Sequence, residues 1–432
     1  MKTTIQSVRG RQVWDSRGRP TLEAEVTLAG GAVGRAIAPA GASRGTHEAI
    51  DLRDGGPRFG GLGVERALAG VEGEIAPALS GLDGADQGEV DRRLRALDGT
   101  PNMARLGGNA TVAVSMAVLH AAAAAEGAPV WRHLARGGPV RLPLPEIQIF
   151  GGGAHAGRRT DVQDFMIMAP NAGSVRRALE ITAEVYRAAG ELMAEASGPA
   201  GVADEGGWWP NFSSTKQALD TLVRAIERAG HRPGEDVWIS LDVAASEFHA
   251  QGRYRLALEA ESLDTIDMVE LIAAWSRAYP ILSIEDPVAE DDVAGMIAVT
   301  RALGHHTQIV GDDFLVTDAH RIAGAARQGA CNCALIKVNQ IGTVSEAHAA
   351  LAAAKAAGWG AIVSARSGES EDVTIAHLAV GWDAGQIKVG SFTRSERMAK
   401  WNELLRIEAA LGEDAVFAGA DALPFAPAHR HG

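Results

Sequence analysis

Six short apolar runs in the second half of the chain each finish on a residue that could take part in chemistry. Successive runs lie about one strand-helix unit apart, which indicates parallel strands joined by helices. In a barrel of such units the C-terminal strand ends meet at one mouth, where active sites are built. We therefore expect three carboxylates, two lysines and an arginine to face one another. The runs finish at Asp242, Glu285, Asp312, Lys337, Arg366 with Ser367, and Lys388.

The three carboxylates, Asp242, Glu285 and Asp312, belong to consecutive units of this series. A single acid after a strand often caps the next helix, but three in succession are stronger evidence for a shared site. Carboxylate oxygens without histidine or cysteine are hard ligands, which suit Mg²⁺ and leave positions open for water or substrate oxygens. The pattern therefore predicts a Mg²⁺ site.

Lysine is rare in this chain, with six among 41 basic residues, so Lys337 and Lys388 at the ends of apolar runs are informative. Salt bridges to the neighbouring acids are one explanation for both. A lysine held among cations and metal in a dry site has instead a depressed pKa and can act as a base. Such a base beside a carboxylate-bound metal suits removal of a proton α to a carboxylate.

The elements that must position these residues form two predicted domains. Residues 1–138 begin with strand-like runs over 6–16 and 21–38 and continue with helical patterns, which predicts a small α+β domain. The Gly- and Pro-rich stretch at 137–150 marks the boundary. From 139 to 432 short apolar runs alternate with amphipathic stretches, which predicts an α/β barrel with a mostly parallel sheet.

Composition narrows the partners of this chain of 432 residues. A net charge of −13 argues against binding to nucleic acid or to an acidic membrane surface, because both bind positively charged protein surfaces. The longest Ala-rich run, 110–130, contains polar residues and favours a buried helix over a membrane span. We expect a cytoplasmic protein, and an anionic substrate would need local cations or metal.

The order of its motifs resembles the enolase family over nearly the whole chain. The resemblance implies an N-terminal α+β lid domain on a modified (β/α)₈ barrel whose second strand pair is antiparallel, two Mg²⁺ ions per active site, and commonly a homodimer or higher homo-oligomer. It rests on "WDSRGRPTLEAEV", "GASRGTHEAIDLRD", "GGNATVAVSMAVLHAAA", "QDFMIMAP", "DEGGWWPN", "SLDVAASEF", "SIEDP", "VGDDFLVT", "IKVNQIGTVSEA", "RSGESEDVTIAHLAVG" and "GQIKVGSFTRSERMAKWNELLRIE".

The same resemblance implies a role for each matching residue. Asp242, Glu285 and Asp312 hold one Mg²⁺, and Ser43 on a glycine-hinged lid loop reaches a second. Lys337 matches the base that takes the C2 proton, and Glu205 the acid that helps the C3 hydroxyl to leave. The remaining matches are substrate-side groups, namely His155, Gln163 and Asp164, the phosphate clamp Arg366 with Ser367, and the carboxylate contact Lys388.

Several positions depart from the family pattern near the leaving hydroxyl. Ala365 replaces the imidazole of a Ser-His-Arg-Ser pattern, and Asp164 stands where the family has Glu. Trp208 and Trp209 replace Phe-Ala beside Glu205, so they reshape a pocket wall or, alternatively, repack the core at the barrel mouth. Arg44 occupies a Thr-like lid position, where a guanidinium could clamp a second phosphate or phosphonate.

These departures predict a specialised paralogue that keeps the enolate half of the site and alters the leaving-group half. Among relatives, the chain looks like the carboxyphosphonoenolpyruvate synthases of phosphinate antibiotic pathways. The alternatives are a housekeeping enolase, which converts 2-phospho-D-glycerate to phosphoenolpyruvate and water, and a non-catalytic protein that kept the fold. Acid-sugar dehydratases and racemases are disfavoured, because their Lys-x-Lys strand is missing.

Overall fold

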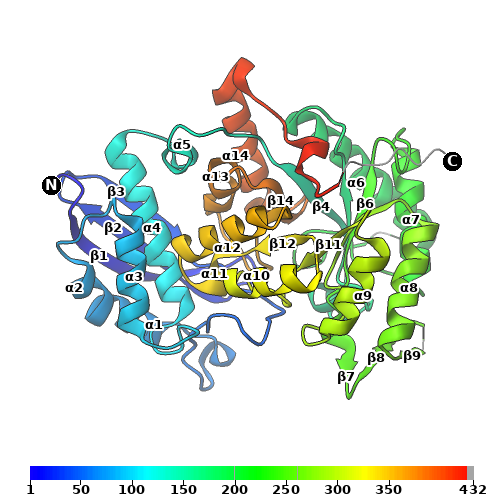
Figure 1. Cartoon of the computed structure of the whole chain (residues 1–432), viewed down its shortest axis with the longest axis horizontal. Coiled ribbons are helices and arrows are strands. Elements are labelled where there is room, and N and C mark those ends of the chain that lie inside the picture. The colour runs from blue at the N-terminus through cyan, green and yellow to red at the C-terminus, as the bar shows by residue number, and fades with distance from the viewer. Residues whose placement is uncertain (199, 260, 426–432) are drawn as a thin grey trace.

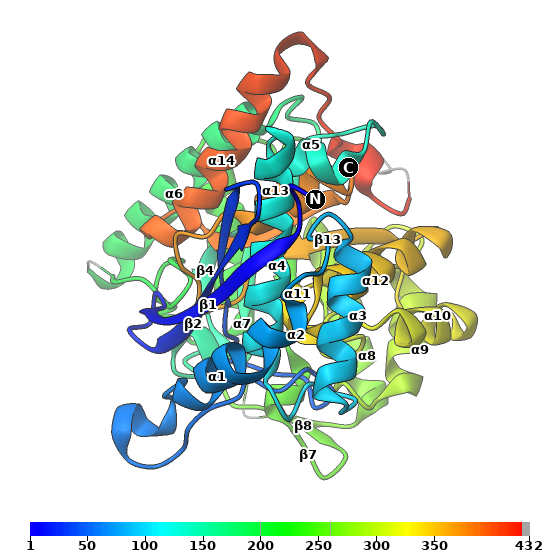
Figure 2. The same cartoon turned by 90° about the vertical axis from the view of Figure 1, so that its left-hand side faces the viewer.

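The first part of the chain forms a three-stranded antiparallel sheet with helices packed on it (Figures 1 and 2). The computed structural model describes residues 1–198, 200–259 and 261–425. The run at 21–38, expected as one strand, is a hairpin, because the chain turns at Gly31 with a positive φ of 87°. The strands are β1 (Ile5–Trp14), β2 (Pro20–Leu28) and β3 (Val33–Ile37).

Five helices follow these strands, and the longest of them, α4, packs directly on β2 and β3. By length and composition α4 could cross a membrane, but 83% of its apolar window is buried inside the fold. The Ala-rich run is therefore a core helix, as expected. The helices are α1 (Glu65–Gly70), α2 (Ala76–Leu79), α3 (Gln87–Asp98), α4 (Gly108–Glu126) and α5 (Val130–Ala135).

A closed eight-stranded barrel is the centre of the second part of the chain, and the predicted boundary at 138/139 falls between α5 and β4. Neighbouring barrel strands are parallel except at β5. The barrel strands are β4 (Leu144–Gly151), β5 (Asp164–Met168), β6 (Trp238–Asp242), β10 (Ile281–Glu285), β11 (Gln308–Gly311), β12 (Cys333–Ile336), β13 (Gly360–Ser364) and β14 (Gly385–Ser391).

The antiparallel pairing that the family resemblance implies is present, since β5 runs antiparallel to both β4 and β6. No α-helix of crossover length lies between β4 and β5 in the described chain, so the chain turns back directly. Two helices, α6 (Val175–Ser197) and α7 (Thr215–Arg228), then join β5 to β6. As a result the first residue of β5, Asp164, lies opposite the last residue of β6, Asp242.

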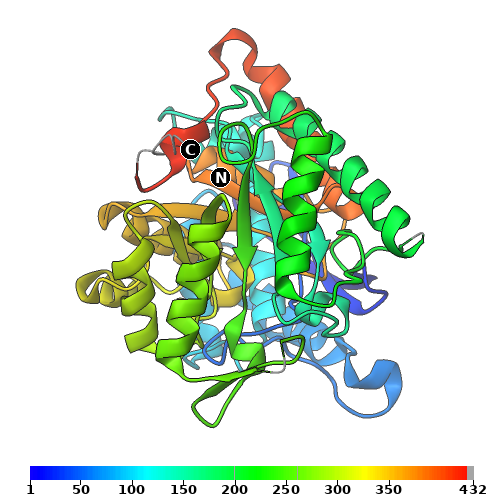
Figure 3. The ribbon, with the colours of Figure 1, turned by 90° about the vertical axis from the view of Figure 1, so that its right-hand side faces the viewer.

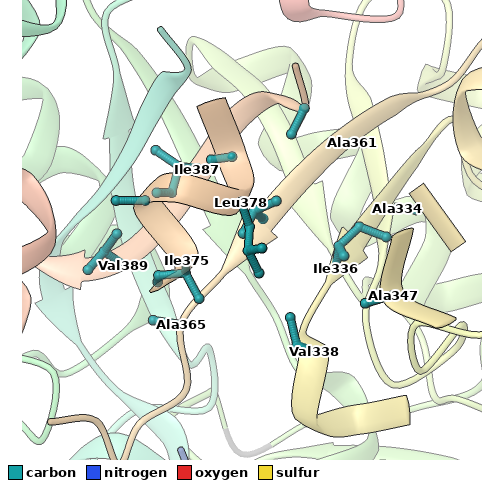
Figure 4. Packing of buried hydrophobic residues seen from close by; sticks show 14 of the residues in the cluster. Ala334, Ile336, Val338, Ala347, Ala361, Ala365, Ile375, Leu378, Ile387 and Val389 are labelled. Carbon is teal, nitrogen blue, oxygen red and sulfur yellow. The ribbon is translucent and has the colours of Figure 1, made fainter. Parts of the chain in front are cut away.

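Helices surround the barrel on its outer side (Figures 1 and 3). Their apolar faces pack on the outward side chains of the strands, as Ile375 and Leu378 do towards Ile387 and Val389 (Figure 4). A small sheet of β7 (His249–Ala250), β8 (Arg253–Leu256) and β9 (Glu261–Leu263) projects beside them. The helices are α6 (Val175–Ser197), α7 (Thr215–Arg228), α8 (Thr265–Ala278), α9 (Val293–Leu303), α10 (Ala319–Gln328), α11 (Val338–Ile341), α12 (Val344–Ala356), α13 (Thr374–Gly381) and α14 (Ser395–Leu411).

The N-terminal part docks on the barrel around the loop that follows β13. Ala40 exchanges backbone hydrogen bonds with Gly368, and the Ile37 N–H donates to the Asp372 carboxylate. These contacts place the loop at 41–47, which we call the lid loop, at the C-terminal ends of the barrel strands.

Candidate active site

A cavity at the barrel mouth gathers most of the residues that the sequence singled out. The lid loop forms one side of it, the segments that carry His155 and Glu205 form another, and the ends of β6, β12 and β13, the start of β5 and the middle of β14 complete it. Of the predicted site residues, those that line the cavity are Ser43, His155, Gln163, Asp164, Glu205, Asp242, Lys337, Arg366, Ser367 and Lys388, together with Ala365.

Lys388 lies at the centre of a carboxylate cluster. Its Nζ is 2.9 Å from Asp242 Oδ2, 2.7 Å from Glu285 Oε2 and 3.6 Å from Asp164 Oδ2. Burial lowers the pKa of this amine, but the surrounding carboxylates outweigh burial and raise it well above its usual range. Lys388 sits inside β14, which continues to Ser391, so it is not the strand end that the apolar run suggested. It is a fixed cation.

Lys337 follows β12 and donates from Nζ to Asp312 Oδ2. Asp312 is held on its other side, where Oδ1 accepts from Gln340 Nε2 at 2.8 Å. Burial lowers the pKa of Lys337, but Asp312 outweighs burial and raises it. The direction is opposite to the depressed pKa expected of a base, because a carboxylate rather than a cation is the nearest charged group. The salt-bridge alternative for both lysines describes their contacts correctly.

The acids beneath the cavity outnumber the two lysines beside them, and burial disfavours the ionised form of three of these acids. Burial, followed by neighbouring carboxylates, raises the pKa of Glu285, Asp286 and Asp313. Glu285 Oε1 is buried and has no hydrogen-bond partner in the described chain. An orphaned carboxylate oxygen among hard oxygen donors suits a bound cation, so these residues fit Mg²⁺.

The tightest acidic groups differ from the predicted trio. Ligand atoms lie within 4.8 Å of one another in two groups of described residues, Asp286 with Asp312 and Asp313, and His155 with Asp164 and Glu205. Asp286 accepts the backbone N–H groups of Asp312 and Asp313, at 3.0 and 2.8 Å, so its oxygens are already engaged. Of the predicted trio, Glu285 is the residue with a carboxylate oxygen left without a hydrogen-bond partner in the described chain.

Arg366, the predicted phosphate clamp, is engaged by the lid. Its two terminal nitrogens donate to both oxygens of Glu48, at 2.8 and 3.2 Å, to the Ser43 carbonyl at 3.0 Å and to Asn339 Oδ1 at 3.1 Å. An anion that binds these nitrogens must displace one of the four acceptors. Ser367 is held separately, because Arg17 Nη1 donates to its Oγ at 3.1 Å.

His155 lies between two carboxylates on the leaving-group side of the cavity. Its Nδ1 is 2.9 Å from Asp164 Oδ1, and its Nε2 is 3.6 Å from Glu205 Oε1. Burial lowers the pKa of His155, but Glu205 and Asp164 outweigh burial and raise it to about 9. At neutral pH this group is an imidazolium that can donate a proton.

Trp208 is not a wall of the cavity, which corrects the pocket interpretation in favour of core repacking. Its ring stacks on Tyr186 of α6 with centroids 4.9 Å apart, and its Nε1 donates to the Tyr186 carbonyl at 2.9 Å. A Cβ at Gly190 would lie 2.4 Å from the ring. Trp209 is 37% exposed and lies against Gly157, outside the described cavity lining.

Replacing Trp208 with alanine is expected to lower the free energy of unfolding by roughly 3 kcal/mol, because the variant leaves a gap against α6. Substrate KM should stay unchanged, since the ring does not reach the cavity. Thermal unfolding and steady-state kinetics of Trp208→Ala and Trp208→Phe test this pair of expectations. A KM change without loss of stability would restore the pocket-wall interpretation.

Two other departures occupy different environments. Arg44 is exposed on the lid loop and is not among the described residues that line the cavity, so the structure does not bring it to the site. Ala365 borders the cavity, and its methyl group also joins the buried cluster that contains Ile375 and Val389 (Figure 4). Ala365 thus contributes both to the cavity lining and to the packing behind it.

Sequence reasoning missed Glu48, Gln340 and Gln148, which hold the site residues in place. Glu48 and Gln340 engage Arg366 and Asp312 as described above. Gln148 donates to Asp164 from within β4. A signal was available for Gln148, since Glu146 and Gln148 are polar residues two apart in an otherwise apolar strand and must share the barrel interior.

Comparison with protein families gave two matches that together span most of the chain. The model described as the enolase N-terminal domain matches residues 5–134. The model described as the enolase C-terminal TIM barrel domain matches residues 139–425.

Proposed function

The chain belongs to the enolase family, as an enolase-like lyase, and on this premise we propose that it removes the C2 proton of a 2-phosphoglycerate-type substrate to form an enolpyruvyl product. We propose further that it is a specialised paralogue of the carboxyphosphonoenolpyruvate synthase kind. Such an enzyme joins an activated phosphonoformate to the enolpyruvyl unit: the enol oxygen bonds to the phosphonate phosphorus as the activating nucleotide leaves it, and the substrate's phosphate is released from that oxygen to water. Its substrates are small phosphorylated or phosphonylated anions.

In this proposal Lys337 is the base, because its amino group enters the cavity from the end of β12. Lys388 and Arg366 bind the substrate carboxylate and phosphate with Ser367, and Gln163 contacts the substrate from the start of β5. The lid must release Arg366 for phosphate to reach its terminal nitrogens. Lid movement therefore accompanies binding.

Asp242, Glu285 and Asp312 would hold one Mg²⁺, and Ser43 of the lid loop would reach a second. When bound, Mg²⁺ supplies positive charge for the carboxylate that becomes an enediolate as C2 loses its proton. The orphaned oxygen of Glu285 supports the first of these positions.

The observation that carries the specialised assignment is Ala365, which borders the cavity with a methyl group where the family pattern has an imidazole. Loss of one general acid-base partner commonly lowers a rate by about 10²- to 10⁴-fold. A housekeeping enzyme would tolerate this loss poorly.

A housekeeping enolase is the second candidate, and one observation favours it. His155 is held as an imidazolium between Asp164 and Glu205, so an acid remains on the leaving-group side. In that case water departs from C3 with a proton from this group.

Restoring an imidazole by Ala365→His separates the two candidates. In a specialised paralogue, the variant should gain dehydration of 2-phosphoglycerate by about 10²-fold, because the missing acid-base partner returns. In a housekeeping enolase, turnover should change little. Rates of phosphoenolpyruvate formation measure the difference, and Ala365→Asn serves as a control that adds a larger polar side chain without a titrating group.

We propose that the protein is a cytoplasmic homodimer or higher homo-oligomer, as family members commonly are. Its N-terminal part exposes Trp14 and Phe59, whose rings pack edge to face with centroids 5.4 Å apart. Exposed aromatic side chains of this size support association.

A further inference from the structure

Gln148 is a fully buried amide that joins the two carboxylates of the leaving-group side. Its Nε2 donates to Asp164 Oδ1, and its Oε1 accepts the Gly207 N–H at 2.8 Å. Gly207 lies in the turn that carries Glu205, and the Glu205 carbonyl in turn accepts the Ser391 N–H at 3.0 Å. One side chain therefore fixes both the acid on β5 and the turn that bears the second acid.

The bond from Gln148 also decides which way Asp164 faces. Asp164 Oδ1 receives Gln148 Nε2 and His155 Nδ1, so its capacity on that side is used. Oδ2 is left without a hydrogen-bond partner among the described residues and lies 3.6 Å from Lys388 Nζ. The carboxylate thus turns one oxygen to the imidazolium and the other towards the fixed cation.

The approach of Gln148 to the turn is unusually close. A Cβ on Gly207 would lie 2.4 Å from Gln148 Oε1, so only glycine admits the amide at this distance. A shorter amide at 148 could not span from β4 to both Asp164 and Gly207. The longer amide at position 148 therefore reaches the shorter acid at position 164, where the family pattern has a glutamate.

We propose that Gln148 is a positioning residue for departure of the leaving group, and that its length, one methylene more than that of asparagine, offsets the methylene that Asp164 lacks relative to glutamate. The inference rests on the proposed function, because it assigns Asp164, His155 and Glu205 to the leaving-group half. Gln148 contacts no substrate itself in this assignment. It acts in two ways: it orients Asp164 towards His155, and it fixes the position of the turn that carries Glu205.

A reciprocal exchange of side-chain length tests the inference. Gln148→Asn should slow formation of the enolpyruvyl product by about 10²-fold, because the acids lose their alignment. Exchange of the C2 hydrogen of 2-phosphoglycerate with solvent should stay close to the parent rate, since Lys337 is untouched. The ratio of exchange to product, followed by proton NMR with Mg²⁺, should therefore rise about 10²-fold. The double variant Gln148→Asn with Asp164→Glu should recover most of the loss.

Gln308→Asn is the matched control, because Gln308 is a buried barrel amide that bonds Ser283 and Gln386 rather than Asp164. It should lower the melting temperature without changing the ratio, and Asp164→Glu should not rescue it. Equal loss of exchange and product in Gln148→Asn, or a double variant no better than the worse single variant, would overturn the inference. Absence of exchange and product in the parent enzyme would instead contradict the proposed function. The melting temperatures of the parent, of Gln148→Asn, of Asp164→Glu and of the double variant would then test the inference without activity. If the two side chains compensate in length, the double variant regains the stability that each single variant loses.

Discussion

Lys337→Ala is expected to slow C2 proton removal by about 10²- to 10⁴-fold, the range found when a general base is lost. Lys337 enters the cavity from the end of β12, whereas Lys388 is fixed by carboxylates and cannot take its place. Asp312 keeps the proton on Lys337 in this structure, so the base form requires that Asp312 share its charge with a cation. Solvent exchange at C2 of 2-phosphoglycerate measures the step directly.

Lys355→Ala is the matched control for this variant. Lys355 lies on α12 and donates to the Trp382 and Asp383 carbonyls, away from the described cavity lining. Its removal should leave exchange unchanged. Substantial exchange in Lys337→Ala, at a rate near the parent, would show that another group removes the proton.

Glu285→Gln is expected to abolish the stabilisation that Mg²⁺ gives the folded protein. A ligand that binds only the folded state raises the melting temperature, and Glu285 offers the free oxygen of the proposed cation site. Activity at fixed Mg²⁺ should fall by at least about 10²-fold. Calorimetric melting with and without Mg²⁺ provides the measurement.

In the absence of metal, Glu285→Gln is expected to be at least as stable as the parent protein. The pKa of Glu285 is raised in the folded state, so its ionised form is disfavoured there and stability falls as the pH rises above the unfolded pKa. The neutral amide removes this effect, and the melting temperature in chelator at neutral pH should equal or exceed that of the parent. Glu247→Gln, which alters only the ion pair with Arg158, should keep the full response to Mg²⁺. A full response in Glu285→Gln would exclude Glu285 as a ligand.

The sequence predicted those site residues whose position follows from strand periodicity. Asp242 and Glu285 end β6 and β10, and Lys337 directly follows β12, so the change from apolar to polar residues located them correctly. The family fold, with its closed barrel, is confirmed as well. These features follow from local periodicity and from the order of the motifs, and both can be read directly from the sequence.

Other features depend on which way a strand runs or a side chain turns, and the sequence does not contain that information locally. Asp164 reaches the mouth because β5 is reversed, which the rule of C-terminal strand ends does not anticipate. The ring of Trp208 turns to α6 because Gly190 leaves room for it. The contact between Arg366 and Glu48 joins residues far apart in the chain, so it becomes visible only once the lid loop is placed.

The products formed from 2-phosphoglycerate with Mg²⁺, alone and with cytidylyl-phosphonoformate, test the proposed activity most directly. Phosphorus NMR follows the products of each reaction. A specialised paralogue predicts a product with a carbon-phosphorus bond and an enolpyruvyl group, which appears only when both substrates are present. Rapid formation of phosphoenolpyruvate from 2-phosphoglycerate alone, with no such product when both are supplied, would contradict this assignment and identify a housekeeping enolase.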